Sequence, residues 1–420
     1  MIKTGHISRC QVCNSSQLHL VLDLGHQPLA NTLPRGEELN QPEATYPLRM
    51  MWCQNCTCVQ LDYCVAGEQV YHPGYPYLQS ITKPLLEYQK NISRSLIEKY
   101  ALKKNDLAVD IGSGDGALLS GFKQNGLRVL GVEPTNIARI ANKNGIKTIQ
   151  KFFNIKLAKE IVKKHGQASV ITATNVFAHM QTLGEVIGGI HTLLKKGGVF
   201  VSETHYLLDI IKGSQFDTMY HEHLRTYSLK SLIKLFEYYD FTVTDAERGD
   251  RYGGNLRVHV TKGKGIPVSP RVVELLKLEK EAGLDTLATY EKFADRVRKV
   301  RLAFVDFLVK AKMSGKHVVG KSCPARASTL LNYYGVDSEL MPYLAEQSTS
   351  LKVGKHLAGK HIPIVDEKCL FRKQPDFVVL LAWHYAWPIM ERLKSEGLKS
   401  DFVIPLPDLT LVKKSQVKKN

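Results

Sequence analysis

Apolar runs rich in β-branched residues alternate with helical stretches between about residues 76 and 265. These runs are Leu107–Ile111, Arg128–Val132, Ser169–Ala173 and Gly198–Glu203. Short continuous apolar runs are typical of strands that are buried on both faces of a sheet, and parallel neighbours need helices as crossovers. The alternation therefore predicts an α/β unit that is built on a parallel sheet.

Two further β-like runs, Phe241–Thr244 and Leu256–Val260, follow the fourth run and are placed to complete this sheet. The segment Gly263–Pro270 then contains two glycines and two prolines, which break regular secondary structure. We therefore expect a linker at this segment and a new structural unit beyond it.

Beyond the linker, apolar residues recur at three- and four-residue intervals from Arg271 to Lys312. This spacing predicts one or two long amphipathic helices whose apolar stripe packs into a core. Three short β-like runs follow, at His317–Val319, Ile362–Val365 and Phe377–Leu381. Helical or loop segments separate them, so the pattern indicates a second α/β unit.

The length of the chain, 420 residues, exceeds that of one typical core. Hydrophobic residues make up 44% and charged residues 23%, which are the values of an ordinary folded protein. We therefore predict three domains, at residues 1–75, 76–265 and 266–420. The first shows little periodicity and holds most of the cysteines, so its stability is expected to depend on a metal.

Six of the eight cysteines fall within the first 64 residues. In a C-x-x-C pair both thiolates can turn toward one ion, and two such pairs complete a closed tetrahedral zinc site. The four predicted ligands are Cys10, Cys13, Cys53 and Cys56. Either Cys58 or Cys64 could replace a ligand of the second pair. A closed four-sulfur site has no open position for substrate, so the zinc is expected to be structural.

Paired cysteines of this kind favour metal over disulfides in a reducing compartment, and the first ten residues lack the apolar core of a signal peptide. No apolar run has the length that spans a bilayer. We therefore expect a cytoplasmic protein without a membrane partner. The formal net charge of +17 raises nucleic acid as a partner, but the sequence has no long basic run before its C-terminal tail, and a solvated basic surface is favoured.

A glycine-rich turn follows the first apolar run, because the segment from Leu107 to Gly116 reads L-A-V-D-I-G-S-G-D-G. Glycine permits close backbone approach, so a ligand can lie directly on this turn. Glu133 directly follows the next run, about 20 residues later, where a carboxylate accepts both hydroxyls of a ribose. The acidic residue ahead of the first glycine resembles the S-adenosylmethionine motif more than the nicotinamide motif. The predicted cofactor residues of this Rossmann-like unit are Asp110, Gly112, Ser113, Gly114, Gly116, Glu133 and Pro134.

The sequence Tyr220-His-Glu-His223 concentrates side chains that exchange protons. It follows Gly213 and Ser214, so we expect a loop that covers one end of the sheet. A metal site is one alternative, although the H-E-x-x-H pattern of a catalytic zinc helix is not met. A surface cluster without function is another. Proton chemistry is the favoured interpretation.

The third unit carries a second loop suited to phosphate, Val319–Arg326, at the end of a β-like run. Lys321 and Arg326 carry charges that neutralise a diphosphate, and Ser322 and Thr329 offer hydroxyl donors. We therefore predict that these four residues bind substrate.

Together these motifs resemble those of the three-domain, zinc-containing sugar C-methyltransferases, which act on nucleotide-linked deoxy-keto-sugars. The resemblance covers nearly the whole chain. Besides the cysteine pairs and the glycine-rich turn, it rests on these motifs: Tyr75-Pro-Tyr77, Asn175-Val-Phe-Ala-His179, Tyr220-His-Glu-His223, Gly253-Gly-Asn-Leu-Arg257, Pro324-Ala-Arg326, Thr329-Leu-Leu-Asn332 and Ile404-Pro-Leu-Pro407. It implies an S-adenosylmethionine-dependent enzyme that methylates carbon and binds a nucleotide sugar between its middle and last domains.

The resemblance also implies roles for individual residues. His223 is implied as the base that removes the proton next to the ketone, after which the enolate attacks the cofactor methyl group. Tyr220 and Glu222 would border the reacting sugar. Asn175 and His179 would approach it from the opposite side.

Tyr75 and Tyr77 are implied to reach from the zinc-binding domain toward the active site, although packing explains such aromatic residues as well. In the last domain the chain departs from the usual family form in the part that the resemblance assigns to the sugar nucleotide. The positions that differ are Lys321, Ser322, Arg326, Ala327, Ser328 and His384.

Two other functions compete with this hypothesis. The first is a methyltransferase that acts on nucleic acid or protein, against which the third unit argues. The second is a non-enzymatic zinc-containing protein that binds nucleic acid, which leaves the glycine-rich turn and the Tyr220–His223 cluster without a role. We therefore expect a sugar-modifying enzyme, acting as a monomer.

Overall fold

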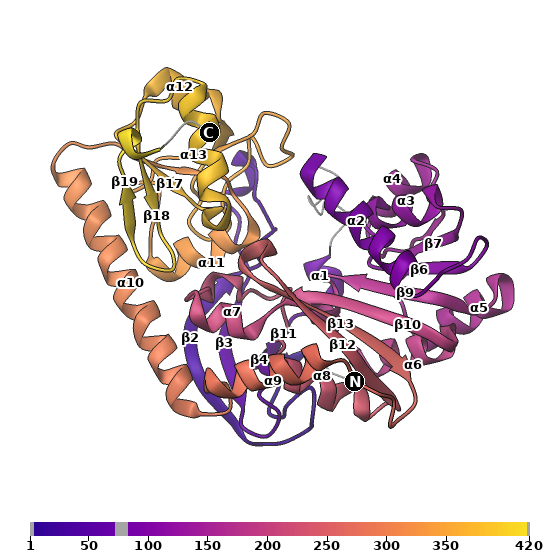
Figure 1. Cartoon of the computed structure of the whole chain (residues 1–420). Helices are drawn as coiled ribbons and strands as arrows, with labels where there is room; N and C mark the ends of the chain where they lie inside the picture. Colours follow the sequence, from indigo (N-terminus) through magenta and orange to yellow (C-terminus); the bar gives the residue numbers. More distant parts are fainter. Residues whose placement is uncertain (1–3, 72–82, 418–420) are drawn as a thin grey trace.

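The computed structural model describes residues 4–71 and 83–417. Within these residues the strands form sheets of seven, six and four strands and one two-stranded pair. Figure 1 shows the seven-stranded sheet at the right, the six-stranded sheet at the upper left and the N-terminal strands below the latter. The long helix α10 (Leu287–Met313) runs along the N-terminal strands.

The seven-stranded sheet has the order β12-β13-β10-β9-β6-β7-β8. Its five strands from β10 to β8 are parallel, whereas β13 and β12 are antiparallel to their neighbours. The four apolar runs and the two that follow them all become strands, so the predicted α/β fold is confirmed. The strands are β6 (Leu107–Ile111), β7 (Arg128–Val132), β8 (Thr148–Ile149), β9 (Ala168–Thr174), β10 (Leu194–His205), β12 (Phe241–Gly249) and β13 (Asn255–Lys262).

Helices cover both faces of this sheet. Ala108 of β6 packs in a cluster with side chains of α2 and α3, whereas Val109 packs in a cluster with side chains of α5 and α6. Successive residues of a strand point to opposite faces, so a strand that is covered on both sides is apolar throughout. The helices are α2 (Lys83–Lys99), α3 (Ala117–Gln124), α4 (Ile137–Lys143), α5 (Ile155–His165), α6 (Leu183–Leu193), α7 (Leu207–Lys212) and α8 (Leu229–Glu237).

The four-stranded sheet contains three strands that the sequence pattern did not predict. Leu48, Met50 and Trp52 alternate along β3 and are buried, which is the period-two signal of a strand. In β2 the pairing with β3 shifts register twice, and these irregularities obscure the alternation. The strands are β2 (Leu18–Pro28), β3 (Thr45–Cys53) and β4 (Val59–Leu61), and the smaller N-terminal elements are β1 (Gly5–His6), β5 (Tyr63–Cys64) and α1 (Gly67–Val70).

The fourth strand of this sheet comes from the middle of the chain. It is β11 (Arg225–Thr226), which pairs with β4 and gives the order β11-β4-β3-β2. The N-terminal sheet therefore continues into the segment that directly follows Tyr220–His223.

The six-stranded sheet has the order β16-β15-β14-β17-β18-β19, and only β19 is antiparallel. Its strands are β14 (Val318–Lys321), β15 (Leu344–Glu346), β16 (Ile364–Asp366), β17 (Phe377–Leu380), β18 (Asp401–Ile404) and β19 (Thr410–Val412). The accompanying helices are α11 (Ala325–Tyr334), α12 (Lys368–Lys373) and α13 (Ala386–Ser395). The second α/β unit is thus present, with the phosphate-type loop between β14 and α11.

Helix α9 (Pro270–Glu281) lies beyond the predicted linker but packs on the central unit, against α8 and β12. Buried Glu279 accepts hydrogen bonds from the backbone N–H of Leu229 and of Lys230 at the start of α8. It also accepts one from the Tyr206 hydroxyl, at 2.9 Å. The division of the chain at residue 265 remains a prediction.

None of the helices in the described ranges combines the length and the apolar composition that crossing a membrane requires.

Candidate active site

The glycine-rich turn lies between β6 and α3. Gly112, Gly114 and Gly116 have φ angles of 71°, 51° and 85°, in the left-handed region that favours glycine. A Cβ atom on Gly112 would lie 2.7 Å from the Val176 side chain, and one on Gly116 would lie 2.9 Å from that of Ile146. Both positions therefore require glycine, and the turn presents bare backbone to its surroundings.

Glu133 follows β7 and lies beside this turn. Its Oε2 accepts a hydrogen bond from the Gly114 N–H at 3.1 Å, and its Oε1 accepts from the Thr135 N–H at 2.9 Å and hydroxyl at 2.7 Å. These bonds hold the carboxylate at the end of the parallel strand, next to Pro134. The position suits an acceptor for the hydroxyls of a ribose.

Asp110 and Ser113 lie beneath the turn. Asp110 Oδ1 accepts from the Thr172 hydroxyl at 2.7 Å, and burial raises the pKa of Asp110 to about 7. Ser113 is fully buried against Gly131. Asp110, Ser113 and Gly116 therefore support the conformation of the turn and do not line the cavity beside it. The predicted cofactor residues that line the adjacent cavity are Gly112, Gly114, Glu133 and Pro134.

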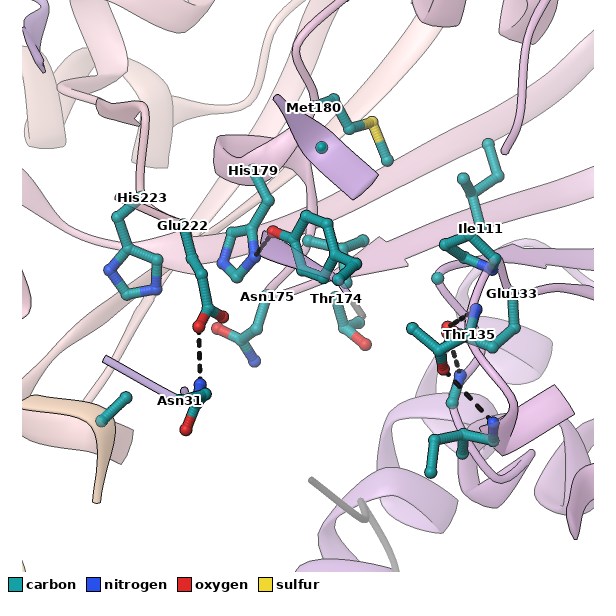
Figure 2. Close-up of a pocket in the computed structure, with 18 of the residues that line it drawn as sticks. Asn31, Ile111, Glu133, Thr135, Thr174, Asn175, His179, Met180, Glu222 and His223 are labelled. Carbon is teal, nitrogen blue, oxygen red and sulfur yellow. Dashed lines mark hydrogen bonds between the residues drawn. The ribbon is translucent and has the colours of Figure 1, made fainter. Parts of the chain in front are cut away.

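This cavity has a volume of about 650 Å³ and is lined by all three parts of the chain. Asn31 and Tyr71 line it from the N-terminal part, and Arg326 lines it from the loop before α11. In Figure 2, Glu133 lies on one side of the cavity and His223 on the other. The cofactor turn and the proton-exchanging loop therefore open into one space.

His223 is held as a neutral base at the cavity wall. Its Nδ1 lies 2.7 Å from the Thr218 carbonyl oxygen, which can only accept, so Nδ1 carries the proton. Its Nε2 therefore carries a lone pair and lies 2.9 Å from the Tyr220 hydroxyl. Burial, with a smaller contribution from the Arg326 cation, lowers the pKa of His223 to about 4.

Two more histidines surround His223. The ring centroid of His179 lies 4.7 Å away and that of His205 lies 5.1 Å away. Burial lowers the pKa of both well below the usual value, and the Tyr71 hydroxyl lies 2.8 Å from Nδ1 of His179. His205 and Tyr71 were not predicted. The place of His205 at the end of a strand is the signal that marks it, as it marks His179.

Glu222 points toward the N-terminal part of the chain. Its Oε1 accepts a hydrogen bond of 2.6 Å from Nδ2 of Asn31, and Figure 2 shows this pair beside Asn175. Asn175 has a φ of 56° and its N–H donates to the Glu203 carbonyl, so it is fixed at the end of β9. The structure thus brings the predicted Glu222 and Asn175 together and adds Asn31, which belongs to no recognisable motif.

Arg326 joins the last part of the chain to the central part. It is buried, its NH2 donates to Gln215 Oε1 at 3.1 Å and its Nε lies 3.5 Å from Asp217 Oδ2. Its NH1 donates to His384 Nδ1 at 3.0 Å, and burial together with this cation lowers the pKa of His384 well below its usual value. Arg326 and His384 both line the cavity.

Three other predicted substrate residues, all of them described by the structure, do not line the cavity. Lys321 is buried within its own sheet, where its Nζ lies 3.1 Å from Glu367. Thr329 is buried and donates its hydroxyl to the Met219 carbonyl at 3.0 Å. Ser322 has a φ of 71° in the loop after β14 and does not line the cavity either. Lys321 thus pairs with a carboxylate inside the sheet, and its contact with a diphosphate stays a prediction.

Tyr75 and Tyr77 lie outside the described residues. Two other tyrosines, Tyr252 and Tyr385, line the cavity with their ring centroids 6.4 Å apart. Tyr252 has a φ of 57°, which is uncommon for a residue other than glycine and indicates a constrained position.

The four predicted zinc ligands come together in the N-terminal part. Their sulfur atoms lie within 4.8 Å of one another, with Cys10 to Cys56 at 3.5 Å and Cys13 to Cys53 at 3.6 Å. A tetrahedral zinc with sulfur at about 2.3 Å separates its ligands by roughly 3.8 Å, so the group fits this ion. Cys58 and Cys64 lie outside this group of four. Their sulfur atoms contact backbone carbonyl groups, and the Cys58 thiol also interacts with the Cys10 thiol.

Three protein-family models match consecutive parts of the chain. A zinc binding domain matches residues 10–71, a methyltransferase domain matches residues 85–246, and a C-methyltransferase C-terminal domain matches residues 250–407. A full-length relative has the same extent. The C-methyltransferase NovU from Streptomyces niveus is 33% identical over 406 residues, which cover 96% of each chain. The chain belongs to the C-methyltransferase family.

Two solved methyltransferase structures each cover 42% of this chain. A magnesium protoporphyrin IX methyltransferase from Synechocystis with bound SAM is 12% identical and covers 42% of this chain and 79% of its own, with a TM-score of 0.33. A SAM-dependent methyltransferase from Archaeoglobus fulgidus is 15% identical and covers 42% of this chain and 94% of its own, with a TM-score of 0.35.

Membership of the C-methyltransferase family confirms that the chain is an S-adenosylmethionine-dependent methyltransferase. The predicted structural zinc is confirmed by the matching zinc binding domain and the four-cysteine group. The alternative of a non-enzymatic protein that binds nucleic acid is therefore wrong.

Proposed function

We propose that the chain methylates a carbon atom next to the ketone of a nucleotide-linked deoxy-keto-sugar. The observation that carries this proposal is that a neutral histidine with a lone pair on Nε2 opens into the same cavity as the cofactor turn. A carbon acid needs such a base, whereas an oxygen or nitrogen nucleophile needs it less. The motifs shared with sugar C-methyltransferases supply the substrate class.

His223 performs the proton transfer in this proposal. The Thr218 carbonyl fixes Nδ1–H, so Nε2 is the atom that accepts the proton next to the ketone. The Tyr220 hydroxyl lies 2.9 Å from Nε2 and has to move away before Nε2 can accept this proton. The hydroxyl can then donate a hydrogen bond to the developing enolate. Burial keeps His223 neutral, because protonating an imidazole away from water is unfavourable.

The cofactor side of the cavity positions the methyl donor. S-adenosylmethionine supplies an electrophilic methyl group when it is bound. Gly112 and Gly114 offer backbone that a ligand can approach closely, and Glu133 offers carboxylate oxygens to ribose hydroxyls.

The substrate side of the cavity holds the sugar nucleotide. Arg326 supplies the positive charge that suits a diphosphate, with His384 beside it. Glu222 and Asn175 offer acceptors to sugar hydroxyls from the wall near the base. The same proposal includes domains at residues 1–75, 76–265 and 266–420 and a monomer that acts in the cytoplasm.

Purified protein, S-adenosylmethionine and a panel of nucleotide-linked deoxy-keto-sugars test this function. The expected product gains one methyl group on carbon, which carbon–carbon couplings in the NMR spectrum identify. In heavy water the wild type is expected to exchange the proton next to the ketone, and His223→Asn is expected not to. Methyl transfer to nucleic acid or protein, with no turnover of any keto-sugar, would overturn the proposal.

A further inference from the structure

Arg225 lies two residues beyond His223 and is among the largest fully buried side chains of the protein. Burying a cation without a counter-charge is strongly unfavourable. Yet among the described residues no carboxylate oxygen lies within 4.0 Å of its guanidinium nitrogens. Its counter-charge must therefore come from another kind of group.

The hydrogen bonds of Arg225 point to that group. Its NH1 donates to the side-chain oxygen of Gln11, which lies between zinc ligands Cys10 and Cys13. Its NH2 donates to the carbonyl of Met180, which directly follows His179. One guanidinium thus contacts the first zinc-binding turn and the segment of an active-site histidine, while its backbone continues the chain from His223.

The backbone makes a parallel connection to the second zinc-binding turn. Arg225 pairs with Gln60 in the ladder of β11 and β4, and β4 begins three residues after Cys56. The Gln60 side chain accepts a hydrogen bond from the Gln11 N–H at 2.7 Å. Both cysteine pairs are therefore tied to the strand that follows the catalytic loop.

A zinc ion with four thiolates carries a net charge of about −2. This anionic group can therefore supply the counter-charge that Arg225 does not receive from a carboxylate. We propose that Arg225 is a positioning residue that balances the charge of the zinc–thiolate group and links it to His179 and His223. Loss of zinc then disorders the base and its neighbour in an otherwise folded enzyme. The zinc site thereby supports catalysis as well as the stability of its own domain.

Three variants of the zinc-loaded protein separate the charge-balancing role of Arg225 from its role as a link to the two histidines. Arg225→Met removes both charge and hydrogen bonds. Arg225→Lys keeps the charge but replaces the two guanidinium nitrogens that bond Gln11 and Met180 by a single ammonium nitrogen. Gln11→Ala breaks the link and leaves the arginine and the cysteines in place. Arg271→Met is the matched control, because it removes an exposed arginine of the same chain that pairs with Asp245.

Three readouts need no sugar substrate. Zinc release to the chelating dye 4-(2-pyridylazo)resorcinol reports the metal site, and S-adenosylhomocysteine affinity reports the fold of the cofactor wall. Imidazole nitrogen NMR signals of His179 and His223 report their tautomers and surroundings. Turnover, where a substrate is in hand, is read as kcat and KM separately.

Arg225→Met is expected to release zinc at least about tenfold faster than the wild type, because the thiolate charge is no longer balanced. Arg225→Lys is expected to release zinc within about threefold of the wild-type rate but to shift both histidine signals. Gln11→Ala is expected to shift the same signals and to lower kcat by about tenfold with little change in KM. All three are expected to bind S-adenosylhomocysteine within about twofold of the wild-type affinity. Arg271→Met is expected to match the wild type in every readout.

Wild-type zinc release and unchanged histidine signals in Arg225→Met would refute the proposal. If that variant does not fold, unchanged histidine signals in both Arg225→Lys and Gln11→Ala refute it instead. Parallel loss of cofactor affinity in all three variants would also refute it, because Arg225 would then be a residue of general stability. None of these outcomes depends on the sugar, so the proposed function stands or fails separately.

Discussion

The two halves of the cavity are built in different ways. The cofactor half, from Gly112 to Glu133, comes from one short stretch of chain and two adjacent parallel strands. The substrate half combines Asn31, the His223 loop and Arg326, which belong to three separate regions of the sequence. The first half depends on backbone conformation, and the second depends on side chains that tertiary contacts bring together.

Because the two halves are built separately, we expect substitutions to affect either cofactor binding or catalysis, but not both. Changes in the cofactor half should act on affinity for the methyl donor. Changes in the substrate half should leave that affinity intact and act on rate or on substrate binding. The following predictions test this separation, beginning with the largest expected effect.

His223→Asn is expected to lower kcat by about 100- to 10,000-fold, the usual contribution of a general base. Asparagine keeps a polar side chain but has no basic lone pair at neutral pH. Rate measurements at saturating substrate, with calorimetry for both ligands, check this prediction. Wild-type kcat in the variant would contradict it, and His179 or His221 would then be the next base to test.

Gly112→Val is expected to weaken S-adenosylhomocysteine binding by about 100-fold or more, because a branched side chain would meet Val176 and the ligand at a φ of 71°. Gly197→Val is the control, since Gly197 has a φ of 73° and a Cβ added there would meet no atom within 4 Å. Calorimetry compares the two variants. Equal affinity in both would contradict the placement of the ligand on the Gly112 backbone.

Arg326→Met is expected to raise the KM for the sugar nucleotide by roughly tenfold, the loss of one charge-assisted contact, with cofactor affinity unchanged. Lys321→Met is the matched control. Its ammonium group pairs with Glu367 inside the sheet, so the variant should lower thermal stability and leave KM near the wild-type value. A larger KM effect at Lys321 than at Arg326 would reverse this assignment of the substrate wall.

The smallest expected effect is that of acidic pH on the base. Burial depresses the pKa of His223 to about 4, so its neutral form persists well below the usual histidine value of about 6.5. Between pH 7 and pH 5.5 the contribution of this residue to kcat/KM should change by less than about twofold. A pH–rate profile checks the range.

The same pH range also distinguishes the cofactor half of the cavity from the substrate half. Asp110, beneath the cofactor turn, has a pKa raised to about 7 by burial, so its charge changes in this range while that of His223 does not. Any change near neutral pH is therefore expected in cofactor affinity. A tenfold fall in kcat at pH 5.5 with constant cofactor affinity would contradict the depressed pKa of His223.

The lowered pKa of His223 also makes the stability of the folded protein depend on pH. Its folded-state pKa lies below the unfolded value, so neutral His223 favours the folded state above about pH 6.5, and this contribution is lost as the pH falls toward 4.

Much of the architecture was predictable from local pattern. The runs at Leu107–Ile111 and Arg128–Val132 coincide with β6 and β7, because strands covered on both faces must be apolar throughout. The strands β2 and β3 were missed, since one face of each is less buried and, in β2, register shifts also interrupt the alternation. Strength of burial therefore decided which strands could be predicted.

The site divides in the same way. Sequence alone determined the four cysteines, the glycine-rich turn and Glu133, because short spacing or adjacent strands fix their geometry. Tertiary structure decided that Asn31 meets Glu222 and that Arg326, but not Lys321, lines the cavity. It also decided the protonation of His223, since burial and the Thr218 carbonyl set its tautomer and its pKa. Contacts between distant segments and desolvation arise only when the chain folds, so no local pattern of residues records them.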